Sequence, residues 1–135
     1  TRRADILVIY SLREWLESSN DDRSAWLSAL KDPSLGRAMS AIHQSPDKAW
    51  TVATLAMEAG MSRTSFAERF KGVVGESPLQ YLTQWRMMLA RTRLRSTRDT
   101  MLAIAMDLGY QSEAAFSRAY KKTMGVTPGQ SRKNL

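Results

Sequence analysis

The sequence contains no cysteine and only one histidine, His43. The lack of cysteine excludes disulfides, thiolate metal sites and cysteine nucleophiles, and a single histidine cannot build a histidine-based metal site within one chain. Neither a nucleophile elbow nor a phosphate-binding glycine loop is recognisable. No apolar run approaches the roughly 20 residues that a membrane span needs; Ile6 to Tyr10, for example, ends after five residues. The sequence therefore predicts no enzyme, no cofactor or metal, and no membrane protein.

Acidic residues are scarce beyond residue 48. Residues 1–48 hold seven Lys/Arg and seven Asp/Glu, whereas residues 49–135 hold 13 and six, so the whole net charge of +7 lies in the second segment. A basic segment beside a neutral one indicates a polyanionic partner, usually nucleic acid. A solvated basic face without a partner stays open on charge alone.

Proline occurs only four times, β-branched runs are short, and apolar residues mostly follow helical spacing, so we expect an all-α chain. Short helices are expected over Ile6 to Leu16, over Ser24 to Leu30, and over Leu35 to Gln44 with Ser34 as its N-cap.

A longer amphipathic helix is expected from Leu79 to Arg95. Its apolar side would carry Leu82, Trp85 and Leu89, and four arginines would point elsewhere: Arg86, Arg91, Arg93 and Arg95.

The chain beyond residue 50 is an imperfect internal repeat. Its first copy runs from Thr51 to Pro78 and its second from Thr100 to Pro128. Matched residues are 49 apart up to the glycine and 50 apart after it. The pairs include Gly60 with Gly109, Phe66 with Phe116, and Phe70 with Tyr120. The one-residue difference falls in the turn after the glycine, where an insertion is tolerated.

Each copy has the pattern of a helix, a tight glycine turn and a second helix. In the first copy Thr51 can cap the first helix, and Gly60 stands where the chain turns with positive φ. Ser62 can cap the second helix, whose Phe66 and Phe70 form a buried stripe. This is the helix-turn-helix pattern, and we expect its aromatic residues to lie in the core.

Burial of the aromatic residues would leave the opposite face of each second helix exposed. A helix fits the major groove, where Arg can take guanine, Glu can accept from cytosine, and Ala or Thr methyls can meet thymine. The exposed side chains are short and mixed, which favours sequence reading over simple phosphate affinity. They are Arg63, Thr64, Ala67, Glu68 and Lys71 in the first copy, and Gln111, Glu113, Ala114, Ser117, Arg118 and Lys121 in the second. Glu68 could instead pair with Arg69 or Lys71.

Two stretches carry a resemblance to a known family. One is Gly60-Met-Ser-Arg-Thr-Ser-Phe-Ala-Glu-Arg-Phe-Lys71, followed by Gly75-x-x-Pro78-x-x-Tyr81-Leu82-x-x-x-Arg86. The other is Ile104-Ala105-x-x-x-Gly109-Tyr110-x-Ser112-x-x-x-Phe116-Ser117-Arg118-x-Tyr120-Lys121, closing on Gly125-Val126-Thr127-Pro128. From about residue 35 to 133 the chain resembles the DNA-binding domain of AraC/XylS-type bacterial transcription regulators.

The resemblance implies seven helices in this region, forming two homeodomain-like helix-turn-helix subdomains bridged by the long helix. It implies contact with two successive major-groove segments about one helical turn apart, roughly 34 Å. Base reading would fall to Thr64, Ala67, Glu68, Glu113, Ala114, Ser117 and Arg118, with Gln111 at the helix entrance; phosphate contact would fall to Arg63, Lys71, Lys121 and Lys122. Gln130-Ser131-Arg132 stands where the family has an aromatic-Arg pair, so we expect a weaker terminal helix.

The resemblance also suggests a division of the chain. Residues 1–33 would be a helical segment or linker from a missing sensor domain, of the cupin-type branch. Residues 34–82 would form the first helix-turn-helix subdomain, 83–95 the linker helix and 96–135 the second subdomain.

The prediction is the C-terminal part of a cytoplasmic, sequence-specific transcription regulator that binds double-stranded DNA. The family's usual mode is activation by contact with RNA polymerase, and a homodimer through the N-terminal segment or the missing domain is compatible with it. Two alternatives stay open. One is a non-specific architectural DNA-binding module. The other is a basic module that binds a protein or an anionic membrane surface, which would need an exposed apolar face on residues 79–95.

Overall fold

The computed structural model describes residues 31–133 of the chain. This part holds seven α-helices and no strand: α3 (Pro33–Gln44), α4 (Val52–Ala59), α5 (Arg63–Val74), α6 (Pro78–Ser96), α7 (Met101–Asp107), α8 (Glu113–Met124) and α9 (Pro128–Lys133). The predicted all-α fold, with two helix-turn-helix subdomains on one long helix, is confirmed for these residues. The helices expected over Ile6 to Leu16 and Ser24 to Leu30 lie outside the described residues.

Helix α3 begins earlier than its sequence suggested. The N-cap is Asp32 and not Ser34: Oδ1 of Asp32 accepts from the backbone N–H of Ser34 (3.1 Å) and of Leu35 (3.3 Å). Pro33 occupies the first helical position, where its fixed φ suits the helix and its missing N–H costs no bond. Asp32 followed by Pro33 therefore marks the start of this helix more strongly than Ser34 does.

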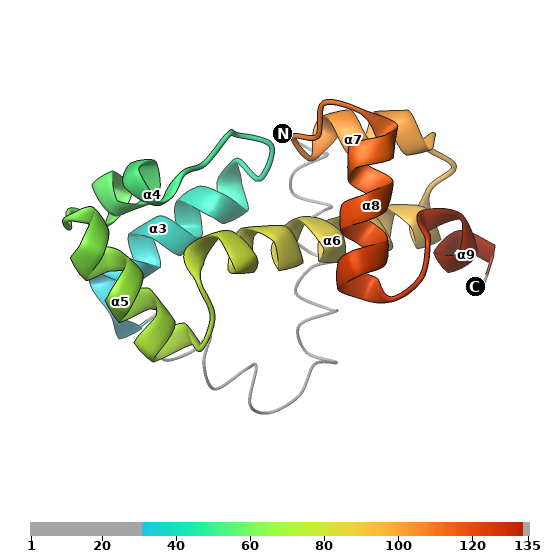
Figure 1. Cartoon of the computed structure of the whole chain (residues 1–135). Coiled ribbons are helices and arrows are strands. Elements are labelled where there is room, and N and C mark those ends of the chain that lie inside the picture. The colour runs from blue at the N-terminus through green and yellow to red at the C-terminus, as the bar shows by residue number, and fades with distance from the viewer. Residues whose placement is uncertain (1–30, 134–135) are drawn as a thin grey trace.

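The structure has two hydrophobic cores, one at each end of α6 (Figure 1). The first joins α3, α4, α5 and the start of α6, with Leu35, Leu55, Phe66 and Phe70 fully buried. The second joins the later part of α6 to α7 and α8, with Ile104, Phe116 and Tyr120 fully buried. The four aromatic residues predicted to lie in the core do so.

Helix α6 connects the two cores as one continuous helix. It starts at the N-cap Ser77, which forms a capping box with Gln80 and is followed by Pro78. Leu82 packs in the first core, Leu89 in the second, and Trp85 between them contacts both. The predicted helix from Leu79 to Arg95 is thus confirmed to within one residue at each end. No helix in the described part of the chain is long and apolar enough to cross a membrane.

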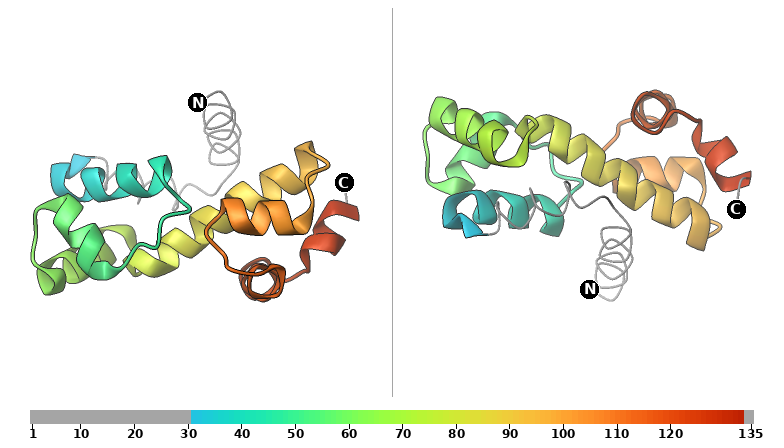
Figure 2. Two further views of the ribbon diagram at one scale, coloured as in Figure 1. Left: turned by 90° about the horizontal axis from the view of Figure 1, so that it is seen from above. Right: turned by 90° about the horizontal axis from the view of Figure 1, so that it is seen from below.

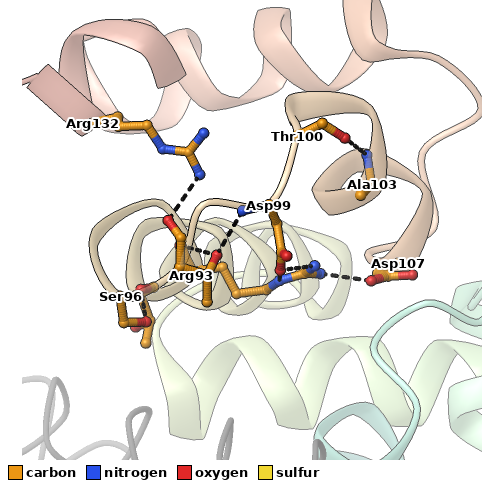
Figure 3. Close-up of polar contacts among 9 residues, drawn as sticks. Arg93, Ser96, Asp99, Thr100, Ala103, Asp107 and Arg132 are labelled. Atoms are coloured by element: carbon orange, nitrogen blue, oxygen red, sulfur yellow. Dashed lines mark hydrogen bonds and ion pairs between the residues drawn. The ribbon is translucent and has the colours of Figure 1, made fainter.

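One arginine of α6 does not point away from the apolar side as predicted. Arg93 is only 2% exposed, and its guanidinium pairs with Asp99 (Nη2–Oδ2 2.7 Å) and Asp107 (Nη1–Oδ2 2.9 Å) (Figure 3). The prediction was wrong because helical spacing identifies a polar residue but not the distant carboxylates that let it be buried.

The short terminal helix α9 is held by hydrogen bonds to backbone carbonyls at the end of α6 and to a side chain of α8. Arg132 donates to the carbonyl oxygens of Leu94 (3.2 Å) and Thr97 (3.4 Å), and Tyr120 Oη lies 2.6 Å from Ser131 Oγ. The residues that replace the expected aromatic-Arg pair therefore make polar contacts to the second subdomain.

Candidate nucleic-acid interface

The first helix-turn-helix unit consists of α4 and α5. Thr51 Oγ1 accepts from the Thr54 N–H (3.1 Å) at the start of α4, and Gly60 ends that helix with φ 69°. Ser62 then caps α5 by accepting from the Ser65 N–H (3.3 Å). The two caps and the left-handed glycine stand where the sequence placed them, and they turn the chain sharply from one helix into the next.

The second unit repeats this construction with α7 and α8. Thr100 accepts from the Ala103 N–H (3.1 Å), Gly109 has φ 90°, and Ser112 accepts from the Ala115 N–H (3.0 Å). Equivalent residues thus have equivalent geometry, and the internal repeat of the sequence is a repeat of structure.

Helices α5 and α8 are built alike: each has a buried face and an exposed face on its opposite side. Each has one stripe of buried rings, Phe66 and Phe70 on α5 and Phe116 and Tyr120 on α8. In both views of Figure 2, α5 and α8 lie on the side of the molecule away from α3. The two helices thus lie on one side of the protein, and residues opposite to the buried rings, such as Glu68 and Arg118, are exposed.

The predicted contact residues lie on or beside α5 and α8, and we call these twelve residues the candidate reading set. Ala67 and Ser117 are half-buried at the edges of the two faces, and the other ten are exposed: Arg63, Thr64, Glu68, Lys71, Gln111, Glu113, Ala114, Arg118, Lys121 and Lys122. The structure thus presents all twelve on the two second helices, with Gln111 just ahead of α8.

The polar members of the candidate reading set have no side-chain hydrogen bond or ion pair with the described residues. The sequence left open whether Glu68 pairs with Arg69 or Lys71. Arg69 instead binds Asp32, with 2.6 Å between Nε and Oδ2. Glu68 and the basic members of the set are therefore available to a ligand.

Other arginines of the described region are held by the protein itself. Arg37 donates from Nε to the Glu58 carbonyl (3.3 Å) and from Nη2 to the Ala59 carbonyl (3.0 Å). Arg93 and Arg132 are bound as described above. These arginines thus hold the fold, whereas the basic members of the candidate reading set are exposed on α5 and α8.

The histidine does not belong to this surface. His43 of α3 stacks on the Trp85 ring, with 3.9 Å between ring centroids, and its Nε2 lies 2.6 Å from Tyr81 Oη. Burial lowers the pKa of His43 from 6.5 to about 4 because the charged imidazolium is poorly solvated there. His43 is therefore a neutral, partly buried residue of the first core.

A set of contacts between the second unit and the loop that leads into the first has no signal in the local sequence pattern. Arg86 of α6 donates to backbone carbonyls of the loop between α3 and α4, which leads into the first unit, and it lies over the Tyr110 ring of the second unit, with 5.5 Å from Cζ to the centroid. Burial raises the pKa of Tyr110, and the positive charge of Arg86 opposes this rise. Arg86 and Tyr110 both belong to the quoted motifs, but only the folded chain brings them together.

These features resemble those of known proteins. The family described as "Helix-turn-helix domain" matches residues 55–134. An AraC-like transcription regulator of Streptomyces lividans is 44% identical over 131 residues, which is 97% of this chain and 43% of that protein. The regulator AlkR of Acinetobacter baylyi is 42% identical over 123 residues, 91% of this chain and 40% of that protein. The chain spans less than half the length of these curated relatives.

Solved structures show the same arrangement. The C-terminal domain of AraT, a response regulator from Geobacillus stearothermophilus, superposes with a TM-score of 0.72 at 32% identity over 76% of this chain and 86% of that one. The DNA-binding domain of the global transcriptional factor AdpA, solved with a target DNA, gives 0.69 at 28% identity over 76% and 92%.

Two helix-turn-helix units on one long helix define the class of bipartite helix-turn-helix DNA-binding domains. Within that class, the chain belongs to the helix-turn-helix family of AraC/XylS-type DNA-binding domains.

Proposed function

We propose that this chain is the DNA-binding part of a transcription regulator and that it reads two adjacent major-groove segments, one with α5 and one with α8. The observation that carries the proposal is the pair of equivalent exposed faces on which the polar members of the candidate reading set have no partners among the described residues. The target DNA bound to the AdpA domain supports it by similarity.

The proposed contacts divide by chemistry. On α5, Thr64, Ala67 and Glu68 would face base edges, with Glu68 accepting from cytosine. On α8, Arg118 would bind guanine through two parallel hydrogen bonds, beside Gln111, Glu113, Ala114 and Ser117. The phosphate contacts would come from Arg63, Lys71, Lys121 and Lys122.

The finer roles in the cell are part of the same proposal. RclR of Escherichia coli, a relative 37% identical over 125 residues, is named as a transcriptional activator, which supports activation over repression. We also propose, from the family, that the protein contacts RNA polymerase and dimerises through the N-terminal segment or a sensor domain. On the same basis we propose that it is cytoplasmic and acts by binding alone, without catalysis. The division into 1–33, 34–82, 83–95 and 96–135 is proposed on the same basis.

The alternative of a basic module for a protein or membrane surface is disfavoured by α6. That alternative needed an exposed apolar face on residues 79–95, but Leu82 and Leu89 are buried in the two cores. Of the large apolar residues of α6, only Leu79 at its start is strongly exposed, at 41%.

Selection of bound duplexes from a random pool, with the whole chain at moderate salt, tests the proposal. We expect enrichment of two sequence boxes whose centres lie about ten base pairs apart. Binding without any enriched sequence, lost steeply as salt rises, would show a non-specific architectural module instead. An absence of DNA binding would refute the proposal for this chain.

A further inference from the structure

The turn of the second helix-turn-helix unit lies directly against the loop that precedes the first. A Cβ atom at Gly109 would lie only 2.5 Å from the carbonyl oxygen of Asp47 and 3.0 Å from its carbonyl carbon. Asp47 belongs to the connection between α3 and α4, so the backbone of the second unit's turn lies against the backbone of the loop that leads into the first unit. The equivalent glycine of the first unit, Gly60, has no such neighbour: its Cβ would be 3.6 Å from an Arg37 side-chain atom.

Arg86 binds this loop from the middle of α6. Its Nε donates to the Pro46 carbonyl (2.7 Å) and its Nη2 to the Lys48 carbonyl (2.9 Å), the residues on either side of Asp47. The same guanidinium lies over the Tyr110 ring, and its Nη2 would be 2.9 Å from a Cβ on Gly109. One side chain of the linker helix therefore contacts both the loop that leads into the first unit and the turn of the second.

These contacts give the two units a second connection besides α6 itself. The 19 residues of α6 extend about 28 Å at 1.5 Å per residue, and α5 and α8 pack near its two ends. Long helices curve gently, so α6 alone fixes the angle between α5 and α8 less narrowly than α6 together with contacts beside it. A rigid, planar guanidinium with two donors fixes that angle more narrowly than a flexible side chain would.

We infer that Arg86 is a positioning residue that fixes α5 relative to α8 and thereby selects the number of base pairs between the two DNA boxes. The inference rests on the proposed reading of two boxes by one chain. One added base pair moves the second box by about 3.4 Å and rotates it by about 35° around the DNA axis, since a turn of the duplex is 10–10.5 base pairs. A pair of helices held at one angle cannot follow that movement, whereas a loosened pair can.

Arg37 of α3 supplies a matched control away from the junction between the units. Like Arg86 it donates from Nε and Nη2 to two backbone carbonyls, but those carbonyls belong to Glu58 and Ala59 at the end of α4. Substitution of Arg37 by Gln removes guanidinium-to-carbonyl bonds without touching the junction between the units. It therefore reports the effect of a general loss of stability.

The experiment measures the dissociation constant of the full chain for duplexes with the selected spacing, and with one base pair added or removed. For the unsubstituted protein and Arg37→Gln we expect the altered spacings to bind at least about tenfold more weakly. For Arg86→Gln we expect the ratio of the dissociation constants for altered and selected spacing to fall to about threefold or less. The dissociation constant for a duplex that carries only one box should change less than about twofold. Arg86→Lys keeps the charge but not the planar guanidinium, so its ratio should lie between those of the unsubstituted protein and Arg86→Gln. This variant carries the test if Arg86→Gln does not fold.

Two outcomes separate the inference from the proposed function. If all variants bind the two boxes specifically and Arg86→Gln and Arg86→Lys keep the full spacing ratio, Arg86 does not set the spacing and the inference is wrong, while the proposed function stands. If the unsubstituted chain shows no box preference at all, the proposed function fails and the inference fails with it.

A measurement without DNA adds an independent test. Spin labels on cysteines introduced at the exposed residues Gly72 of α5 and Thr123 of α8 report the distance between these helices, because the chain has no other cysteine. We expect a wider distance distribution in Arg86→Gln than in Arg37→Gln. Equal widths would overturn the inference.

Discussion

Arg93 and Asp107 form an ion pair that ties the C-terminal half of α6 to the last turn of α7, with 2.9 Å between Nη1 and Oδ2. The Arg93 side chain is 3% exposed, whereas those of Asp107 and its second partner Asp99 are 42% and 39% exposed. The pair is therefore asymmetric: the carboxylates can be hydrated without their partner, and the guanidinium cannot. Removing the acids should harm the second subdomain more than removing the base.

We predict that Asp99→Ala combined with Asp107→Ala lowers the free energy of unfolding by about 3–5 kcal/mol, because it leaves a buried charge without its counter-ions. Arg93→Met should cost less, about 1–2 kcal/mol, since an apolar chain of similar length fills the same space. Urea denaturation followed by circular dichroism measures both. A larger loss for Arg93→Met than for the double variant would contradict this account.

The single histidine allows a direct test of the first core. Burial lowers the pKa of His43 to about 4, so an NMR titration of its ring proton should show no inflection near 6.5 in the folded protein. Because the chain has one histidine, the signal needs no assignment. An inflection between 6 and 7 would mean that the ring is more solvated than its stacking on Trp85 implies.

The same pKa shift predicts a pH dependence of stability. The folded pKa lies below the unfolded one, so the unfolded chain binds the proton more tightly, and the stability associated with neutral His43 is complete above pH 6.5. It is lost as the pH falls from 6.5 towards 4. His43→Gln should therefore show a smaller loss of unfolding free energy than the unsubstituted protein over that interval. If the unfolding free energies of the two proteins fell in parallel with pH, His43 would not contribute to the pH dependence of stability.

Two glycines with similar backbone geometry provide a test of the junction between the units. Gly109 and Gly125 have φ values of 90° and 81°, but a Cβ at Gly125 would meet no atom within 4 Å. Gly125→Ala should cost only the strain of positive φ, about 1–2 kcal/mol. Gly109→Ala should cost about 1–3 kcal/mol more, because its methyl group overlaps the Asp47 carbonyl. Thermal unfolding compares the two, and equal losses would mean that the loop around Asp47 yields without cost.

The sequence predicted what is encoded locally. The spacing of Phe66 and Phe70, the glycine after α4 and the repeat of both in the second unit each define a helix, a turn or a buried face within a few residues. These elements are therefore found where they were expected.

The sequence did not reveal contacts made by distant residues. The burial of Arg93 was missed because its partners, Asp99 and Asp107, come six and 14 residues later in the chain and beyond the end of α6. The contact of Gly109 with Asp47 joins two units whose mutual orientation no local pattern specifies. The candidate reading set was predicted residue by residue from the exposed faces and from the family resemblance, and its contacts with DNA stay a prediction.

The proposed division into base and phosphate contacts can be tested on α8 alone. Arg118→Ala should weaken binding to the selected DNA by about 1–3 kcal/mol and change binding to random DNA little, because a bidentate contact to guanine is sequence-specific. Lys122→Ala should weaken both by a similar amount and reduce the slope of log affinity against log salt by about one, because a phosphate contact releases a counter-ion irrespective of sequence. Binding measured on both DNAs at several salt concentrations separates the two effects.

Since both side chains are exposed and neither has a polar partner in the described structure, neither substitution should lower the melting temperature, so a loss of affinity reports on DNA contact itself. An equal loss for Arg118→Ala on both DNAs, together with a reduced salt slope, would make Arg118 a phosphate contact.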